Sequence, residues 1–197
     1  MIVGLVLAGG TSSRLGQPKQ LLPYRGATLL DATLAMARSC RFDQLVVAVG
    51  GAADEVRSTV ALSGCDVVES EAPADGCSSS IAAALAVVDP RAEGLVLLLG
   101  DQPGVRPETV AALVDGAGRA AMGVVRYDDG RGHPFWLGAG TFADLADLHG
   151  DKGVWRLLES GRHDVVEVPV AGPVPLDVDT RADHEALLAA DALRIAP

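Results

Sequence analysis

The stretch that decides the fold stands at the start of the chain, where residues 2–19 read IVGLVLAGGTSSRLGQPK. The apolar run IVGLVLA is typical of a strand that is buried on both faces of a sheet. The two adjacent glycines that end this run allow a tight turn and let the backbone approach a ligand closely. Ligands of open α/β sheets bind beyond the carboxyl ends of the strands, so the residues after each strand are the first candidates for function.

The same alternation of strand and loop continues along the whole chain. Short apolar runs predict strands at Ile2–Ala8, Gln44–Val49, Asp66–Glu69, Gly94–Leu99, Ala121–Tyr127, Phe135–Leu137 and Val165–Val168. Helical spacing predicts helices at Thr28–Ser39, Asp54–Leu62, Ser79–Val88, Pro107–Gly116, Thr141–Leu148, Gly153–Glu159 and Thr180–Leu193. Strands that alternate with helices across short connections form a mostly parallel sheet covered on both faces. We therefore expect a single α/β domain over residues 1–197, with a Rossmann-like three-layer fold.

Charge and composition exclude several classes of protein. The chain holds 16 Lys and Arg against 26 Asp and Glu, a net charge of −10. The sequence has no basic stripe, which argues against a nucleic-acid partner because neutralising phosphates requires clustered cations. No apolar stretch reaches the roughly 20 residues of a membrane helix, so no membrane partner is expected either. No leader segment is visible, and the three cysteines lack the spacing of a zinc site or a disulfide framework. These features predict a cytoplasmic protein.

The loop after the first strand carries the donors and the charges that a triphosphate needs. Gly9 and Gly10 allow close approach, and Thr11–Ser13 add N–H and hydroxyl donors. Arg14 supplies a planar fork, and Lys19, one of only two lysines in the chain, supplies a compact cation. The loop matches neither GxxxxGK[ST] nor GxGxxG, so it is neither a P-loop nor an ordinary dinucleotide-binding turn. A plain glycine turn with two solvated cations is the alternative interpretation.

The segment LAGGTSSRLGQPKQLLPYRG resembles the opening motif of the nucleotidyltransferase superfamily, LA(A/G)GxxxRxGxxKxLLxxxG. It is most similar to the molybdenum-cofactor nucleotidyltransferases, which attach CMP or GMP to the phosphate of molybdopterin. The resemblance implies a fold of the nucleotidyltransferase type, in which the loop backbone cradles the nucleotide and the Arg and Lys hold its phosphates. The implied nucleotide-binding residues are Leu7, Ala8, Gly9, Gly10, Arg14 and Lys19, and the implied catalytic residues are Arg14 and Lys19.

Two acidic segments predict a site for a divalent metal ion. Asp101 follows the buried run Gly94–Leu99, and such a carboxylate suits Mg²⁺ together with phosphate oxygens and water. Asp177 and Asp179 point the same way on an extended segment, where they repel unless a cation or hydrogen bonds compensate them. Capping of a turn or helix is the alternative role for these carboxylates. GDQP and DVDT resemble metal-binding elements of the family, which implies Asp101 and Asp179 as metal ligands, Asp177 as a further candidate, and Mg²⁺ or Mn²⁺ as cofactor.

The segment Asp75–Ser80, which opens the predicted Ala-rich helix, is a candidate for recognising the base of the nucleotide. Free N–H groups and hydroxyls at the start of a helix form a site for an anion or a base, although a serine there can also act as a simple N-cap. The segment resembles the G(M/L)xxS element of the family, with Cys77 in place of the usual Met. The resemblance implies Gly76, Ser78 and Ser80 as nucleotide-binding residues.

Two later motifs, GHP and GDKG, resemble family elements that border the acceptor substrate. They imply His133, Asp151 and Lys152 as acceptor-binding residues. We expect His133 and Lys152 to orient the acceptor or to neutralise its phosphate.

These motifs together imply Mg²⁺-dependent transfer of a nucleotidyl group to the phosphate of a molybdopterin-type acceptor, with release of pyrophosphate. GDQP, PKQLL, GHP, GDKG and DxDT resemble the cytidylyl branch and favour CTP, whereas LAGG is typical of the guanylyl branch and keeps GTP open. A molybdoenzyme or its maturation factor is the implied protein partner. One alternative is another small acceptor, such as a sugar phosphate, methylerythritol phosphate or phospholactate. The other is a carrier that binds the nucleotide without catalysis.

Overall fold

The computed structural model describes residues 1–10, 15–70, 76–150 and 152–195. Its strands are β1 (Ile2–Ala8), β2 (Pro23–Tyr24), β3 (Ala27–Thr28), β4 (Gln44–Val49), β5 (Asp66–Glu69), β6 (Gly94–Leu99), β7 (Met122–Tyr127), β8 (Gly130–Gly138) and β9 (Val165–Pro169). Its α-helices are α1 (Leu29–Ser39), α2 (Ala53–Thr59), α3 (Cys77–Leu85), α4 (Pro107–Ala117), α5 (Phe142–Ala146), α6 (Gly153–Glu159) and α7 (Arg181–Ile195). Short 3-10 turns occur at η1 (Lys19–Leu21) and η3 (Ala139–Thr141).

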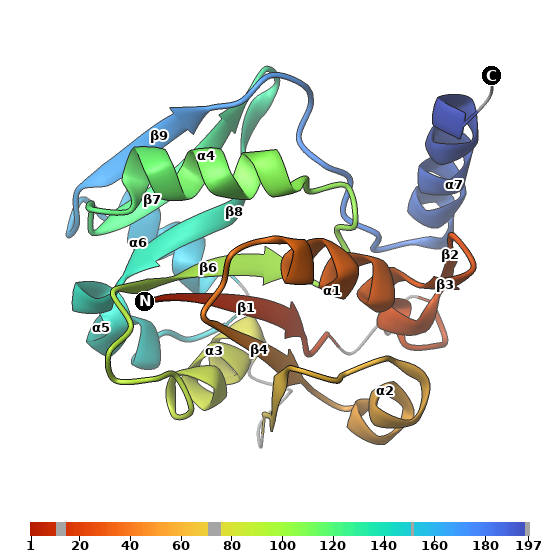
Figure 1. The fold of residues 1–197 in the computed structure, drawn as a ribbon, viewed down its shortest axis with the longest axis horizontal. Coiled ribbons are helices and arrows are strands. Elements are labelled where there is room, and N and C mark those ends of the chain that lie inside the picture. The colour runs from red at the N-terminus through yellow and green to blue at the C-terminus, as the bar shows by residue number, and fades with distance from the viewer. Residues whose placement is uncertain (11–14, 71–75, 151, 196–197) are drawn as a thin grey trace.

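A seven-stranded sheet with the order β5-β4-β1-β6-β8-β7-β9 forms the centre of the molecule (Figure 1). Strand β1 pairs in parallel with β4 and β6, β4 pairs in parallel with β5, and β7 pairs in parallel with β9. Only β8 runs against its neighbours β6 and β7 within the described sheet. The predicted α/β fold with a mostly parallel sheet is confirmed.

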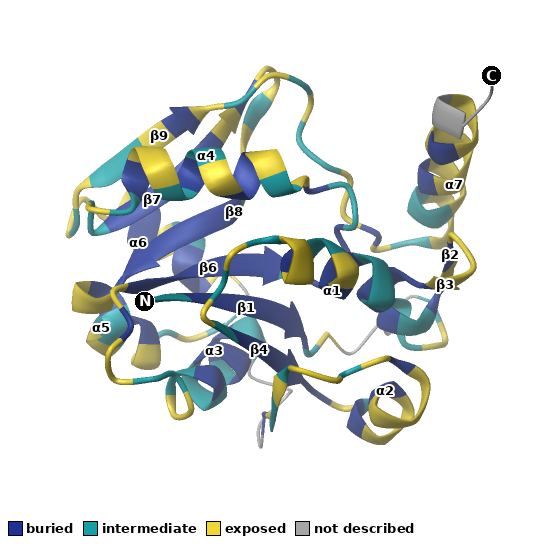
Figure 2. Ribbon diagram, viewed as in Figure 1, coloured by how far each residue is buried: buried dark blue, intermediate teal, exposed yellow. Residues whose placement is uncertain are grey.

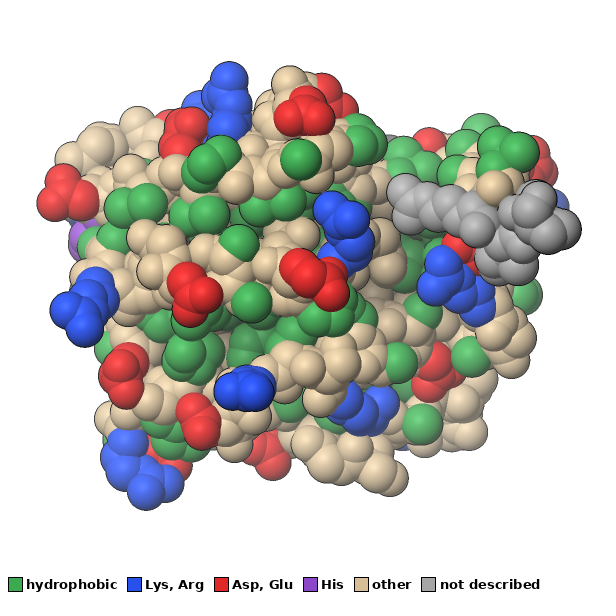
Figure 3. Space-filling model, turned by 45° about the horizontal axis from the view of Figure 1, so that its top comes forward, with side chains coloured by type: hydrophobic (Ala, Val, Ile, Leu, Met, Phe, Trp, Pro, Cys, Tyr) green, Lys and Arg blue, Asp and Glu red, His purple; other side chains and the backbone are tan. Residues whose placement is uncertain are grey.

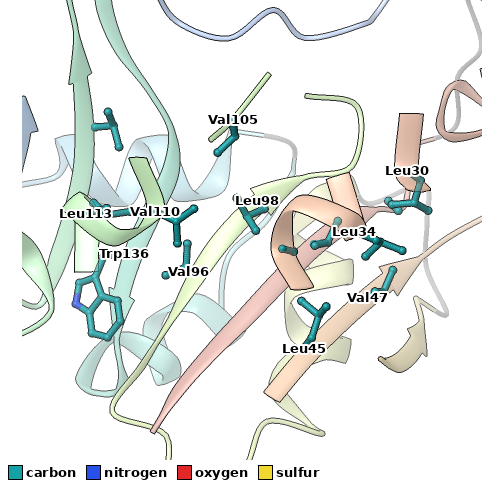
Figure 4. Packing of buried hydrophobic residues seen from close by; sticks show 14 of the residues in the cluster. Leu30, Leu34, Leu45, Val47, Val96, Leu98, Val105, Val110, Leu113 and Trp136 are labelled. Atoms are coloured by element: carbon teal, nitrogen blue, oxygen red, sulfur yellow. The ribbon is translucent and has the colours of Figure 1, made fainter. Parts of the chain in front are cut away.

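Helices cover both faces of this sheet, so the strands lie in the middle layer of three (Figures 1 and 2). One face is packed by apolar side chains of α1, α2 and α4, and the other by side chains of α3, α5 and α6. Figure 4 shows the first of these layers, where Leu34 of α1 lies beside Val47 of β4. Strands buried on both faces explain why the sequence reads as nearly continuous apolar runs at β1, β4 and β6.

The structure differs from the sequence-based expectation at β8, which is longer than the predicted Phe135–Leu137. It begins at Gly130 and continues through Pro134, where a proline normally limits a strand because it donates no ladder hydrogen bond. An irregularity in the register between Val124 and Val125 of β7 lies opposite this part of β8 and accommodates it. The extension carries His133 to the same edge of the sheet as the carboxyl end of β6, because β8 is antiparallel to β6.

A small satellite core attaches α7 to the rest of the molecule. The β2–β3 hairpin, which the sequence analysis did not predict, turns at Arg25 and Gly26, both in the left-handed region, as a two-residue hairpin turn of type I′ requires. Apolar residues of the hairpin region, α1, the segment before α7 and α7 itself form this core, which comprises Leu22, Tyr24, Leu29, Val178 and Leu187. Figure 1 shows α7 standing at the β2–β3 end of the molecule.

Two surface properties bear on the partners that the protein can bind. On the face shown in Figure 3, Lys and Arg side chains are interspersed with Asp and Glu and do not form a stripe. Within the described part of the chain, no helix has the length and apolar character needed to cross a bilayer.

Candidate nucleotide and metal site

The loop after β1 is held by a buried glutamine. The Gln20 side chain is only 2% exposed, and its Nε2 donates hydrogen bonds to the carbonyl oxygens of Ala8 (2.6 Å) and Gly10 (3.3 Å). The side chains of Leu7 and Ala8 belong to the two cores on opposite faces of the sheet. These two residues therefore support the loop from inside, whereas Gly9 and Gly10 are accessible at its surface.

Gly9 lies so close to two other elements that it has no room for a side chain. A Cβ atom at position 9 would stand 2.5 Å from Ser80 Oγ of α3, and a Cβ on Gly50 would overlap the Gly9 carbonyl oxygen. This close approach joins the ends of β1, β4 and α3 at one place. The predicted loop residue Arg14 and its neighbours Thr11–Ser13 lie outside the described residues.

The start of α3 lies against the loop that contains the GDKG motif. Gly76 precedes the helix with φ of 79°, in the region that favours glycine. Ser78 Oγ donates a 2.5 Å hydrogen bond to the Gly150 carbonyl oxygen, and a Cβ on Gly153 would stand 2.8 Å from the same hydroxyl. The segments predicted to recognise the base and to border the acceptor, far apart in sequence, are therefore in direct contact.

Two of the predicted nucleotide-binding residues, Ser78 and Ser80, are buried, and their role stays a prediction. Both belong to α3, in which Ile81 and Ala84 are buried as well. The Ser78 hydroxyl donates to the Gly150 carbonyl oxygen, and Ser80 Oγ lies against Gly9. Gly76 is the member of the predicted set that is accessible at the helix start.

Lys19 joins the two acidic segments that the sequence places 78 residues apart, at Asp101 and Asp179. Its Nζ forms an ion pair with Asp101 Oδ2 and a 2.7 Å ion pair with Asp179 Oδ1. Burial opposes the charged ammonium, but the two carboxylates outweigh this effect and raise the pKa of Lys19 above its usual value. Lys19 is therefore a protonated cation held between two carboxylates at the carboxyl edge of the sheet.

Asp177 borders the same group of charges. The residue is exposed, but its carboxylate is partly enclosed, and this desolvation together with repulsion from Asp101 and Asp179 raises the pKa of Asp177 to about 6. The surplus of negative charge around Lys19 is the electrostatic condition that favours binding of a further cation.

The predicted acceptor-binding residues that the structure describes lie in different surroundings from one another. The His133 ring stacks on Phe135 at 4.0 Å and meets the edge of Trp155 at 6.2 Å between ring centroids. Burial in this aromatic group lowers the pKa of His133 to about 3, so the ring is neutral near pH 7. Of the two roles expected for His133, a neutral imidazole suits orienting the acceptor rather than neutralising its phosphate, and the acceptor-binding role stays a prediction. Lys152 is exposed, and Asp151 lies outside the described residues.

Residues 4–166 match the family model of the MobA-like NTP transferase domain. The chain belongs to this family. Asp179 lies beyond the matched residues, yet it contacts Lys19 inside them, so the C-terminal segment contributes to the site of this MobA-like NTP transferase.

Solved structures of mycobacterial proteins are similar to the chain over nearly its whole length. The homologue of Rv0371c from Mycobacterium sp. strain JC1 is 57% identical, with a TM-score of 0.92, and the match covers 99% of this chain and 98% of that one. Rv0371c from Mycobacterium tuberculosis H37Rv, solved in complex with manganese, is 53% identical with a TM-score of 0.88, and the match covers 96% and 98% of the two chains.

Among curated proteins, the bifunctional protein GlmU from Paraburkholderia phymatum is 38% identical over 133 residues. This match covers 66% of the MobA-like chain and 29% of GlmU, so the chain spans less than a third of the length of that relative.

The residues present in this MobA-like NTP transferase fit a divalent cation. The Lys19 ammonium stands between Asp101 and Asp179, which shows that both carboxylates can face one positive charge. In the described residues, no group of three or more His, Cys, Asp and Glu side chains is arranged to hold a metal ion. A two-carboxylate site nonetheless suits Mg²⁺ or Mn²⁺, which keep water ligands and take further oxygens from substrate phosphates.

Sequence reasoning missed two buried amides of this site. Gln20 holds the loop after β1, and Gln102, which follows Asp101, is 1% exposed and donates to the Pro175 carbonyl oxygen at 2.7 Å. Both stand within motifs that were recognised, PKQLL and GDQP. The signal in the sequence was a glutamine within an apolar or turn segment. A glutamine that becomes buried there is expected to hold neighbouring backbone, because buried amides are normally hydrogen-bonded.

Proposed function

We propose that the protein transfers a nucleotidyl group from CTP to the phosphate of a molybdopterin-type acceptor in a Mg²⁺-dependent reaction, with GTP as the alternative donor. The observation that carries the proposal is the convergence of Lys19, Asp101 and Asp179 beside the accessible Gly9–Gly10 backbone. Cationic and carboxylate groups next to a glycine loop suit a bound triphosphate and its counter-ion. Because Asp179 completes the group, residues 1–197 act as one catalytic domain in this proposal.

In the proposed reaction, an oxygen of the acceptor phosphate forms a bond to the α-phosphorus of the nucleotide. The bond from the α-phosphorus to the bridging oxygen breaks, and pyrophosphate leaves. A phosphate monoester is already largely dianionic near pH 7, because its second pKa is about 6, so no general base has to remove a proton. This is consistent with the neutral, stacked His133, which would orient the acceptor.

Electrostatic stabilisation and positioning then supply most of the catalysis. Lys19 would leave its carboxylate partners to hold the transferring and leaving phosphates, and Arg14 is proposed for the same role from its place in the motif. Asp101 and Asp179 would hold the metal ion, which would supply charge neutralisation at the phosphates. The manganese complex of the 53% identical Rv0371c supports a divalent cofactor.

The choice between CTP and GTP rests on motif resemblances that point in opposite directions. The motifs GDQP, PKQLL, GHP, GDKG and DxDT favour CTP through their resemblance to the cytidylyl branch. Gly9 gives the chain the LAGG form, and the packing of Ser80 Oγ against it accounts for the absence of a methyl group at this position. This packing explains Gly9 without reference to the base, so CTP remains the proposed donor.

The direct test is pyrophosphate release with each of the four nucleoside triphosphates, with Mg²⁺ or Mn²⁺, and with or without molybdopterin. We expect release with CTP only when metal and acceptor are both present. Lys19→Ala and Asp101→Ala should each lower turnover by about 100-fold or more, on the scale seen when one charge-stabilising group is removed.

The matched control is Asp115→Ala, which removes a carboxylate from the exposed side of α4, away from the site. It should leave turnover unchanged. Release with GTP alone would reassign the donor, and release only with a sugar phosphate, methylerythritol phosphate or phospholactate would reassign the acceptor. Nucleotide binding without metal-dependent release would favour the carrier, and near-normal rates in both site variants would refute the proposed site.

A further inference from the structure

The segment that carries Asp179 has no regular secondary structure to hold it in place. Residues 170–180 connect β9 to α7 without forming a helix or a strand. Backbone groups of such a segment must find hydrogen-bond partners elsewhere, because no ladder supplies them. The carboxylates of Asp128 and Asp129 accept hydrogen bonds from the backbone N–H groups of Gly172 (2.9 Å) and Val174 (2.8 Å). These contacts fix the first part of the segment but not the part next to Asp179.

The part next to Asp179 is held by the turn that follows β6. The Gln102 Nε2 donates to the Pro175 carbonyl oxygen at 2.7 Å, and the Asp101 carbonyl oxygen accepts from the Val178 N–H at 3.2 Å. A Cβ on Gly104 would lie 3.2 Å from Pro175 Cβ, so this glycine leaves room for the proline. The turn that presents the Asp101 carboxylate therefore also fixes the backbone that presents the Asp179 carboxylate.

The buried Gln102 side chain carries an energetic penalty, because one of its polar atoms lacks a hydrogen-bond partner among the described residues. It is 1% exposed, and in the described part of the chain its Oε1 has no hydrogen-bond donor. A buried acceptor without a donor destabilises a fold, whereas an apolar side chain of similar shape at this position would not. Packing alone therefore does not account for an amide at position 102. The amide N–H of Gln102 can donate a hydrogen bond to the Pro175 carbonyl oxygen, which an apolar side chain cannot do.

We infer that Gln102 is a positioning residue that sets the separation between the Asp101 and Asp179 carboxylates, and thereby the affinity of the site for a divalent cation. The inference rests on the proposed function in one respect, namely that these carboxylates bind the metal. Gln102 itself touches neither a cation nor a phosphate in this assignment, since its amide is directed to the Pro175 carbonyl oxygen.

The test is the variant Gln102→Met, which keeps the length of the side chain and removes both the donor and the buried acceptor. We expect the dissociation constant for Mn²⁺ alone, followed by electron paramagnetic resonance of the free ion, to rise about tenfold, as on loss of other groups that orient metal ligands. Amide hydrogen exchange at residues 176–179 should become faster. The urea midpoint should change little, because one hydrogen bond and one unpaired acceptor are lost together.

Three further variants separate positioning from a general structural effect. Gly104→Ala should weaken Mn²⁺ binding by displacing Pro175 without changing Gln102. In an Asp179→Ala background, Gln102→Met should change the Mn²⁺ dissociation constant less than twofold, because the carboxylate through which it acts is gone. The matched control is Gln44→Met at the opposite end of the sheet, where Gln44 Nε2 bonds Asp66 and Val87; it should leave Mn²⁺ binding unchanged.

The outcomes distinguish this inference from the proposed function. If the wild-type protein binds Mn²⁺ but Gln102→Met binds it equally well, or weakens binding equally in the Asp179→Ala background, the positioning role is wrong. If the wild-type protein does not bind Mn²⁺, the proposed metal site is wrong, and hydrogen exchange still decides the role of Gln102. Unchanged exchange at residues 176–179 in Gln102→Met would overturn it.

Discussion

Gly9 shows how closely single residues are fitted around the candidate nucleotide loop. Its backbone is in contact with Ser80 of α3 and with Gly50 after β4, so three elements meet where only a hydrogen atom fits. The motif identified this glycine from the sequence, but the residue that excludes a methyl group there lies 71 positions away.

The first prediction concerns this contact. Gly9→Ala should lower the free energy of unfolding by about 1–3 kcal/mol, because the added methyl overlaps the short, rigid side chain of Ser80. Adding Ser80→Ala should restore most of this loss, since the nearest atom would then be Cβ of residue 80 at 3.6 Å. Urea unfolding of both single variants and the double variant measures the coupling. Equal losses in Gly9→Ala with and without Ser80→Ala would show that the overlap is not the cause.

The start of α3 shows where the sequence-based helix boundary was wrong. The sequence placed the helix start at Ser79, whereas α3 begins at Cys77 after Gly76. Ser78 and Ser80 stand about 200° apart around the helix, because each residue advances it by about 100°. They are therefore buried by different neighbours, Ser78 by Gly150 and Gly153 and Ser80 by Gly9. Which side of a short Ala-rich helix is buried cannot be predicted when nearly all of its residues are small and apolar.

The first turn of helix α7 fixes the backbone next to Asp179, and Leu187 in the helix anchors α7 to the satellite core. Thr180 and Asp183 cap the helix reciprocally, as the Thr180 N–H donates to Asp183 Oδ2 at 2.7 Å and the Asp183 N–H donates to Thr180 Oγ1 at 3.2 Å. This cap fixes the backbone next to Asp179. The anchor is Leu187, which packs with Val178 in the satellite core and is 9% exposed.

The second prediction compares two leucines of α7. Leu187→Ala should destabilise the protein by about 2–4 kcal/mol, because it leaves a cavity in the satellite core. The same substitution at Leu193, which is 80% exposed, should change stability by less than about 0.5 kcal/mol. Urea unfolding measures both. Mn²⁺ binding, measured on the folded variants, should weaken only in Leu187→Ala, and equal effects at the two positions would contradict an anchoring role.

At the scale of the whole molecule, one sheet separates two apolar cores and brings distant motifs to one edge. Gly100 N–H donates to the Leu7 carbonyl oxygen at 2.9 Å, so the loops after β1 and β6 begin side by side. His133 reaches the same edge only because β8 is antiparallel. Its ring packs between β8 and α6, which makes its protonation a property of the entire fold.

The third prediction is a pH dependence of global stability. The folded protein lowers the pKa of His133 to about 3 by burial, whereas an unfolded histidine titrates near 6.5. Below pH 6.5 the unfolded chain therefore takes up a proton that the folded protein does not. The contribution of His133 therefore leaves the free energy of unfolding at its highest above about pH 6.5 and lowers it as the pH falls toward 3.

Urea unfolding of the wild-type protein and of His133→Phe between pH 4 and pH 8 measures this effect. As the pH falls, the free energy of unfolding of the wild type should decrease relative to that of His133→Phe, because phenylalanine cannot be protonated in either state. A difference that is constant over this range would show that His133 titrates equally in both states.

The sequence by itself determined the order of the strands and helices of the central sheet and its layers, the mostly parallel sheet, and the places of the loop and acidic motifs, but not the β2–β3 hairpin. These features follow from local patterns, namely apolar runs, helical spacing and glycines at strand ends. Only the tertiary structure decided that Lys19 lies between Asp101 and Asp179, that Ser78 and Ser80 are buried, and that Gln102 holds the segment before α7. The physical reason is that these contacts join residues far apart in the chain, and their geometry depends on strand order, helix rotation and burial, which no local pattern specifies.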